Sequence, residues 1–276
     1  MYGKYILLQM LVIIPLNLIN IMAFHFISRP TLIQVNYLVV GGGGAGSPLN
    51  GGGNAGGGGG EVLQGLSSSF SLTTPYSLSV GLPANWDFTG MTLAQASTKS
   101  VFGSLSANAG KTVNYIDSSG ASSGNGNLGG KSTFDSSGLF YGGGGGGSGG
   151  AGQSASASPY QSGAGGIGIV STVPGIVGTF GVGGNGQSDY NIPPFNSGAF
   201  ATGNGGDGGI DGNGRYIYPY QGGNGGSGII VIQIPSSYNA TFTGDLTYTS
   251  PSVAGYKTYI ITSTTGNVKV TFSYYV

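Results

Sequence analysis

The sequence predicts an all-β fold in which short strands flank a bundle of extended glycine helices. Three observations predict it. Glycine occupies 60 of the 276 positions and is concentrated in runs. The last run leads directly into the apolar stretch 229–234, which has the composition of a fully buried strand. No stretch after residue 26 carries a helical period longer than about three turns, so no substantial α-helix is expected there.

The glycine runs are expected to be ordered. The alternative is a set of flexible linkers, which Gly-rich sequences often form. However, apolar residues make up 38% of the chain and charged residues only 6%, the reverse of the balance that is typical of disordered segments. Ordering glycine has a high entropic cost, which is reasonable where backbones pack closer than a Cβ atom would allow.

The runs carry a local period of three. Gly203, Gly206, Gly209 and Gly212 are in phase, and the runs near residues 144 and 222 repeat the pattern. Three residues per turn is the repeat of the polyproline II helix, so we expect polyglycine II-type helices whose backbones hydrogen-bond to their neighbours. The positions predicted to pack inside this bundle are Gly43, Gly58, Gly144, Gly206, Gly209 and Gly225.

Strands are expected on both sides of the glycine runs, in a β-sandwich or jelly-roll-like arrangement. Residues Gln34–Val40 precede the first run, and apolar residues alternate with Ser and Thr near residues 70–80, which indicates a strand pair or a bent strand. After the last run, Tyr256–Thr262 and 268–272 read as two strands joined by a turn at Gly266-Asn267. We therefore divide the chain into an apolar segment 1–33, a glycine-rich domain 34–235 and a C-terminal strand segment 236–276 that packs on it.

The N-terminal segment is apolar from Tyr5 to Phe26. A signal peptide, a membrane anchor and an upstream extension all remain open, because Ala23 makes a poor cleavage site and polar residues interrupt the stretch. Membrane contact, and any helix, is expected only through residues 5–26. Asn239 begins a glycosylation sequon, which matters only in a eukaryotic secretory pathway.

Two motifs suggest ligand chemistry, and we interpret both as structural. Gly41, Gly43 and Gly46 match a dinucleotide-binding pattern, but Pro48 and the glycines after it cannot begin the required helix. The stretch with Asp207 and Asp211 is similar to a calcium-binding Gly/Asp repeat, yet it occurs in one copy. Solvated loop carboxylates are the better interpretation of these two residues.

Composition argues against catalysis and nucleic-acid binding. Cysteine is absent, and the only histidine lies in the apolar N-terminal segment, so we expect no enzyme, no metal site and no cofactor. Eight basic and eight acidic residues give a net charge of zero, and the basic residues are scattered, which excludes a nucleic-acid footprint. A surface with so little charge favours self-association.

Aromatic residues between the glycine runs are the candidate binding residues. Tyrosine on Ser-, Gly- and Asn-rich loops offers a large contact area at a low entropic cost. The alternative is that these rings cap a bundle that has no side chains of its own. The receptor-binding candidates are Tyr160, Tyr190, Phe195, Tyr216, Tyr218 and Tyr220.

The order of these motifs resembles the glycine-rich domain of phage and giant-virus proteins. The motifs are YLVVGGGGAGS from Tyr37, SLSVGL from Ser77, the segment Ser100–Gly103, and GGNGGSGIIVIQI from Gly222. The C-terminal GYKTYIITSTTGNVKVTF is similar to the strand segment that usually precedes such a domain. In phage tail-tip adhesins, domains of this kind pack polyglycine helices together and contact the host receptor through the loops between them.

The resemblance implies a structural protein of the virion surface, of the fibre, spike or adhesin type. Its expected partners are a host cell-surface receptor, either glycan or protein, or other virion proteins, and its expected location is the virion surface or the extracellular space. A purely structural capsid-cement or extracellular filament subunit is the first alternative, because exposed β edges support assembly. An ice-binding protein is a weaker one, since the runs lack regularly spaced Thr or Ala.

Overall fold

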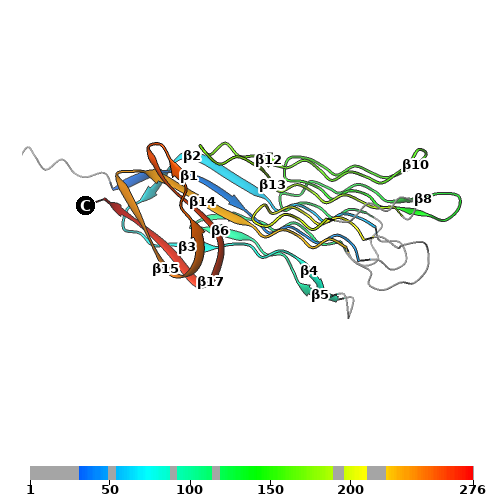
Figure 1. Ribbon diagram of the computed structural model, residues 1–276, viewed down its shortest axis with the longest axis horizontal. Helices are drawn as coiled ribbons and strands as arrows, with labels where there is room; N and C mark the ends of the chain where they lie inside the picture. The colour runs from blue at the N-terminus through cyan, green and yellow to red at the C-terminus, as the bar shows by residue number, and fades with distance from the viewer. Residues whose placement is uncertain are drawn as a thin grey trace, which may run out of the picture. The chain divides into compact units, whose positions relative to one another are not determined.

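Strands and extended segments make up the described chain, which contains no helix. The computed structural model describes residues 31–48, 54–87, 92–113, 119–188, 196–209 and 222–275. Within the unit Ile33–Val276, the longer strands gather at one end, and the glycine-rich segments leave them side by side (Figure 1). The prediction of an all-β chain is therefore confirmed for the described residues. No helix in this part of the chain is long and apolar enough to cross a membrane, and residues 5–26 lie outside it.

The main sheet has nine strands in the order β2-β1-β14-β17-β3-β6-β7, with β15 and β16 also pairing with β17. β2 and β7, at the two ends of this order, lie close together, so the sheet is nearly closed. Its strands are β1 (Leu32–Val40), β2 (Val62–Ser71), β3 (Tyr76–Ser79), β6 (Ser100–Phe102), β7 (Leu105–Ala107), β14 (Ile229–Pro235), β15 (Tyr238–Thr249), β16 (Ser252–Val253) and β17 (Tyr256–Tyr274).

Outside this sheet, the described residues form four two-stranded antiparallel pairs. They are β4 (Asn85–Asp87) with β5 (Thr92–Gln95), β8 (Thr133–Phe134) with β9 (Phe140–Tyr141), β10 (Ser156–Ala157) with β11 (Tyr160–Gln161), and β12 (Ile169–Val170) with β13 (Thr179–Phe180).

The antiparallel pair β1 and β14 forms the centre of the hydrophobic core. Alternate residues of both strands enter two different apolar clusters, and the second face also holds the buried pair Asn36 and Gln233, whose amides are joined by a hydrogen bond of 2.9 Å. One face packs against Phe70, Phe102 and Phe272, and the rings of Phe70 and Phe102 stack with centroids 4.7 Å apart. The other face packs against Ile176 and Phe180 near the β12–β13 hairpin. The predicted strand Gln34–Val40 and the predicted burial of residues 229–234 are thus confirmed.

The predicted turn at Gly266-Asn267 is wrong. β17 runs through these residues without reversing, and its hairpin partner β15 is reached through residues 250–255. Gly244 on β15 falls in a register shift opposite this region, and both Gly244 and Gly266 have positive φ values, of 89° and 73°. The glycines therefore form an irregularity that bends a long strand rather than ending it. The bent strand pairs with β14 in its first half and with β3 in its second.

The glycine segments bond to one another through their backbones, and we call residues 41–47, 54–61, 108–113, 119–131, 142–155, 163–168, 181–188, 203–209 and 222–228 the glycine bundle. In segment 54–61, residues three apart donate to the same neighbour. Gly56 and Gly59 donate to the carbonyls of Gly143 and Gly146 at 3.0 and 2.9 Å. The residues between them donate to segments 203–206 and 108–111, and the segment accepts from three further segments. A single backbone is thereby surrounded by bonded backbones, which satisfies its buried polar groups.

Close approach of backbones requires glycine at many of these positions. A Cβ atom built at Gly43, Gly58, Gly144, Gly206 or Gly225 would collide with the carbonyl oxygen of a neighbouring segment. At Gly206 the obstacle is the Gly223 carbonyl, a backbone group that cannot rotate away. Gly209 donates its N–H to the Ser47 carbonyl at 2.8 Å. Gly150 differs, because a Cβ there would meet only the flexible Ile167 side chain, at 3.3 Å.

Gly206→Ala is therefore expected to destabilise the fold severely, while Gly150→Ala is tolerated. Both changes add one methyl group to a glycine segment, but only the first forces two backbones apart. We expect a loss of about 3 kcal/mol or more for Gly206→Ala, as for severe overpacking, and a change within about 0.5 kcal/mol for Gly150→Ala. Urea unfolding followed by circular dichroism compares them, and equal midpoints would contradict close backbone packing.

Candidate ligand-binding cleft

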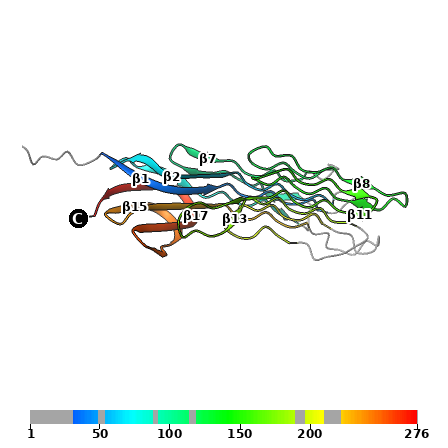
Figure 2. The ribbon, with the colours of Figure 1, turned by 90° about the horizontal axis from the view of Figure 1, so that it is seen from above.

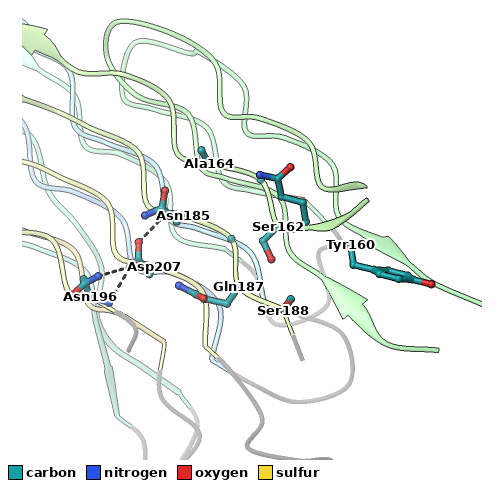
Figure 3. Close-up of a pocket in the computed structure, with 11 residues that line it drawn as sticks. Tyr160, Ser162, Ala164, Asn185, Gln187, Ser188, Asn196 and Asp207 are labelled. Atoms are coloured by element: carbon teal, nitrogen blue, oxygen red, sulfur yellow. Dashed lines mark hydrogen bonds between the residues drawn. The ribbon is translucent and has the colours of Figure 1, made fainter. Parts of the chain in front are cut away.

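β11 lies at the end of the glycine bundle away from the main sheet (Figure 2). Tyr160 and Gln161 of this strand line a cleft together with neighbouring glycine segments. Its walls come from β11 and from the glycine segments that follow it, and its volume is about 380 Å³. The side chains that the argument uses are Tyr160, Ala164, Asn185, Gln187, Asn196 and Asp207 (Figure 3).

Tyr160 is the aromatic residue of the cleft. It begins β11, opposite Ala157 of β10, and is 62% exposed. Its ring stacks on the ring of Tyr141, which is 1% exposed, with centroids 5.9 Å apart. The Tyr141 hydroxyl donates to the Asp135 carboxylate at 3.2 Å, and the pKa of Asp135 is lowered, chiefly by the hydrogen bond from the Ser137 hydroxyl. Tyr160 thus offers an accessible ring on a buried aromatic support.

Asp207 links two of the segments that line the cleft. The residue is only 4% exposed and its carboxylate accepts the Asn185 N–H at 2.8 Å, the Asn196 N–H at 3.0 Å and the Asn196 side-chain amide at 3.1 Å. The interpretation of Asp207 as a solvated loop carboxylate is therefore wrong. A buried carboxylate is stable here because three N–H donors replace its water, and Asp211 lies outside the described residues.

The hydrogen bonds also fix which way two amides point. The Asn185 Oδ1 accepts the Gly165 N–H at 3.0 Å, so the Asn185 Nδ2 is left as the donating group. The Asn196 Nδ2 donates to Asp207, so the Asn196 Oδ1 is left as the accepting group. Because a backbone N–H only donates and a carboxylate only accepts, these orientations follow from the chemistry of the partners. The cleft therefore holds oriented amide donors and acceptors.

Of the predicted binding residues, the structure describes Tyr160 and places it at the cleft. Tyr190, Phe195, Tyr216, Tyr218 and Tyr220 lie outside the described residues. The sequence analysis missed Asn185, Gln187 and Asn196, which line the cleft together with Asp207. Their signal in the sequence is the interruption of a glycine run by an amide, as in GGNGQ at residues 183–187.

Asp207→Ala is expected to destabilise the protein by about 2 kcal/mol or more, because it leaves three N–H groups of the cleft without an acceptor. Asp245→Ala is the matched control, since Asp245 lies exposed on β15. Its removal should change stability by no more than about 0.5 kcal/mol. Thermal unfolding followed by circular dichroism measures both variants. The same melting temperature for both would show that Asp207 does not hold the segments together.

Comparison with known proteins places this architecture in a family. The sequence profile described as a glycine-rich domain matches residues 23–235. No curated protein and no solved structure matches the chain. The match covers most of the chain, from before β1 to the end of β14, and so includes the whole glycine bundle and the cleft. The chain therefore belongs to the glycine-rich domain family.

Proposed function

We propose that this chain is a structural protein of a virion surface, of the fibre or adhesin type, that binds a host receptor. In this proposal the glycine segments form a bundle of polyglycine II helices on a sandwich- or jelly-roll-like base. The bundle holds the cleft at a distance from that base. Binding involves no chemical conversion, and the protein acts on the virion surface or in the extracellular space.

The pattern of hydrogen bonds supports polyglycine II helices. A helix with three residues per turn directs every third N–H to the same neighbour. Segment 54–61 follows this rule for each of its three donating directions. It also accepts in three directions, as Gly57 does from Gly184 and Gly58 from Gly44, both at 2.8 Å. Such a helix has no internal hydrogen bonds, so it is stable only inside a bundle.

Burial follows the same period. Along residues 161–170, Gln161, Ala164, Ile167 and Val170 are exposed, whereas Gly163 and Gly166 between them are buried. Residues 107–113 repeat this pattern, with Ala107, Gly110 and Val113 buried and Asn108 and Lys111 exposed. A strand would alternate with a period of two. A period of three therefore favours polyglycine II helices at the edge of the bundle, in which every third residue faces solvent.

The single observation that carries the receptor-binding proposal is the position of the cleft. A bundle held together by backbone hydrogen bonds needs few side chains, yet Tyr160, Asn185 and Asn196 line this cleft and are exposed. The cleft borders β11, which lies at the end of the bundle away from the sheet (Figure 2). Side chains whose conformations are already fixed by hydrogen bonds to the bundle lose little further entropy when a ligand binds. The aromatic segments between Ser188 and Asn196 and between Gly209 and Gly222 connect the glycine segments that line or adjoin this cleft.

Binding of the labelled whole chain to a panel of bacterial and unicellular eukaryotic cells tests the proposal. We expect saturable binding to some of these cells, reduced at least tenfold by the combined change Tyr216→Ser, Tyr218→Ser and Tyr220→Ser. Tyr275→Ala is the control, because Tyr275 is also exposed, at 66%, but follows β17 at the sheet end. Binding to no cell type, or unchanged binding by the triple variant, would contradict receptor binding through these segments.

A structural subunit without a receptor is the second candidate, and β15 favours it. This strand pairs with β17, and most of its residues are exposed or half-buried. A long edge of this kind is suited to pairing with another chain. Electron microscopy and light scattering of the purified chain separate the two candidates. Ordered assemblies without cell binding would support the subunit, and a cell-binding monomer would support the adhesin.

A further inference from the structure

We propose that the side chains of Ala164 and Ile167 prevent the glycine bundle from pairing with the backbone of a second copy of this chain. Both residues lie in segment 163–168, at an edge of the bundle. Their N–H groups are free to pair, and their side chains block the close approach that pairing requires. The inference concerns association between copies, so it does not rest on receptor binding.

Segment 163–168 has fewer bonded neighbours than a segment inside the bundle. Segment 54–61 bonds to six backbones, three that accept its N–H groups and three that donate to its carbonyls. Segment 163–168 bonds to three, the backbones of 142–145, 149–153 and 183–186. It therefore lies at the edge, with part of its surface turned to solvent.

This edge leaves two N–H groups free with the period of the helix. Among the described residues, no acceptor bonds to the N–H of Ala164 or of Ile167, whereas those of Gly163, Gly165 and Gly166 all donate. Both residues are exposed, Ile167 at 70%. Residues three apart point the same way in a helix with three residues per turn. A further helix with this repeat would accept from both, and the glycine segments of a second copy have that repeat.

Two other edge segments follow the same rule. The N–H groups of Ala109 and Thr112 have no acceptor within the described part of the chain, and neither have those of Ala151 and Ser154. These residues are also three apart, and all four are exposed or half-buried. Each of these pairs of free N–H groups therefore belongs to residues that carry a side chain rather than to glycines.

The spacing inside the bundle explains why a side chain blocks pairing. A Cβ atom built at Gly166 would collide with the Gly150 carbonyl oxygen, and one built at Gly144 would collide with that of Ala164. A backbone added at the same spacing beside Ala164 and Ile167 would meet Cβ atoms that are present. Ile167 extends the barrier beyond its own segment, because its Cγ1 would lie 3.3 Å from a Cβ atom built at Gly150.

Such a barrier is needed because little else keeps two bundles apart. Pairing between glycine segments uses backbone groups alone, so it does not distinguish one copy from another. The net charge is zero and only 6% of the residues are charged, so repulsion between copies is weak. Unpaired strand edges pose the same problem in sheets, where side chains and bulges at the edge prevent further pairing.

Sedimentation velocity of the purified whole chain tests the proposal with two double variants. Ala164→Gly with Ile167→Gly opens the edge, whereas Ala164→Ser with Ile167→Ser removes apolar surface but keeps both Cβ atoms. We expect the glycine pair to associate at a concentration at least tenfold lower than the wild type, and the serine pair to match the wild type within twofold. Association of the glycine pair should also slow amide hydrogen exchange in residues 161–170, because their free N–H groups become bonded.

Gly150→Leu, added to the glycine pair, tests whether the barrier is steric. A Cβ atom at Gly150 points at the Ile167 side chain, so a leucine there returns bulk to the same surface from the neighbouring segment. We expect association to return to the wild-type level. Circular dichroism confirms that each variant is folded. If the glycine pair does not fold, Ile167→Gly with and without Gly150→Leu makes the same comparison.

Three results would overturn the proposal. The first is a folded glycine variant that associates no more than the wild type. The second is equal association of the glycine and serine pairs, or association that Gly150→Leu does not reverse, because the missing side-chain bulk would then not be the cause. The third is wild-type association that the serine pair abolishes, which would make this surface a contact instead of a barrier. None of these results depends on cell binding, so the receptor function stands or falls separately.

Discussion

The fold depends on hydrogen bonding between backbones that have no side chains to keep them apart. In segment 54–61, the N–H groups of residues 56–61 point in three directions around the chain, and each donates to a carbonyl of another glycine segment. This arrangement meets the backbone's polar requirements without a helix or a conventional sheet. It also makes glycine a geometric requirement, because a Cβ at Gly57 or Gly145 would collide with a neighbouring carbonyl. The entropic cost of ordering glycine is offset because many bonds form together.

The nearly closed sheet supplies the hydrophobic core of the protein, because the glycine segments have few side chains from which to form one. The transition between the two occurs where β1 ends, and buried hydroxyl groups satisfy the backbone there. Ser100 is fully buried and its hydroxyl donates to the Val40 carbonyl at 2.5 Å while accepting the Gly81 N–H at 2.8 Å. The Ser148 hydroxyl accepts the Val62 N–H at 3.0 Å where β2 begins. Serine hydroxyls thus replace the backbone hydrogen-bond partners that a strand loses where it leaves the sheet.

Sequence patterns predicted the fold class and the central strands because those depend on local composition. The buried stretch 229–234 is apolar at nearly every position, so it could be assigned without its partners. The turn at Gly266 was mispredicted because glycine serves equally in a hairpin turn and in a bulge, and only the pairing of β17 with β15 on both sides of Gly266 decides between them. The cleft could not be predicted either, since Asn185, Asn196 and Asp207 meet only through the packing of separate segments.

The residues that interrupt the glycine runs follow one physical rule. The side-chain oxygen of Asn204 accepts the Val182 N–H, that of Asp207 accepts the Asn185 N–H, and that of Asn185 accepts the Gly165 N–H. Each of these oxygens therefore takes the place of a backbone carbonyl for a donor on a neighbouring segment. These three interruptions serve packing in this way. At the cleft, the same bonds also orient amides that border open space, so a binding surface arises from the rule that holds the bundle together.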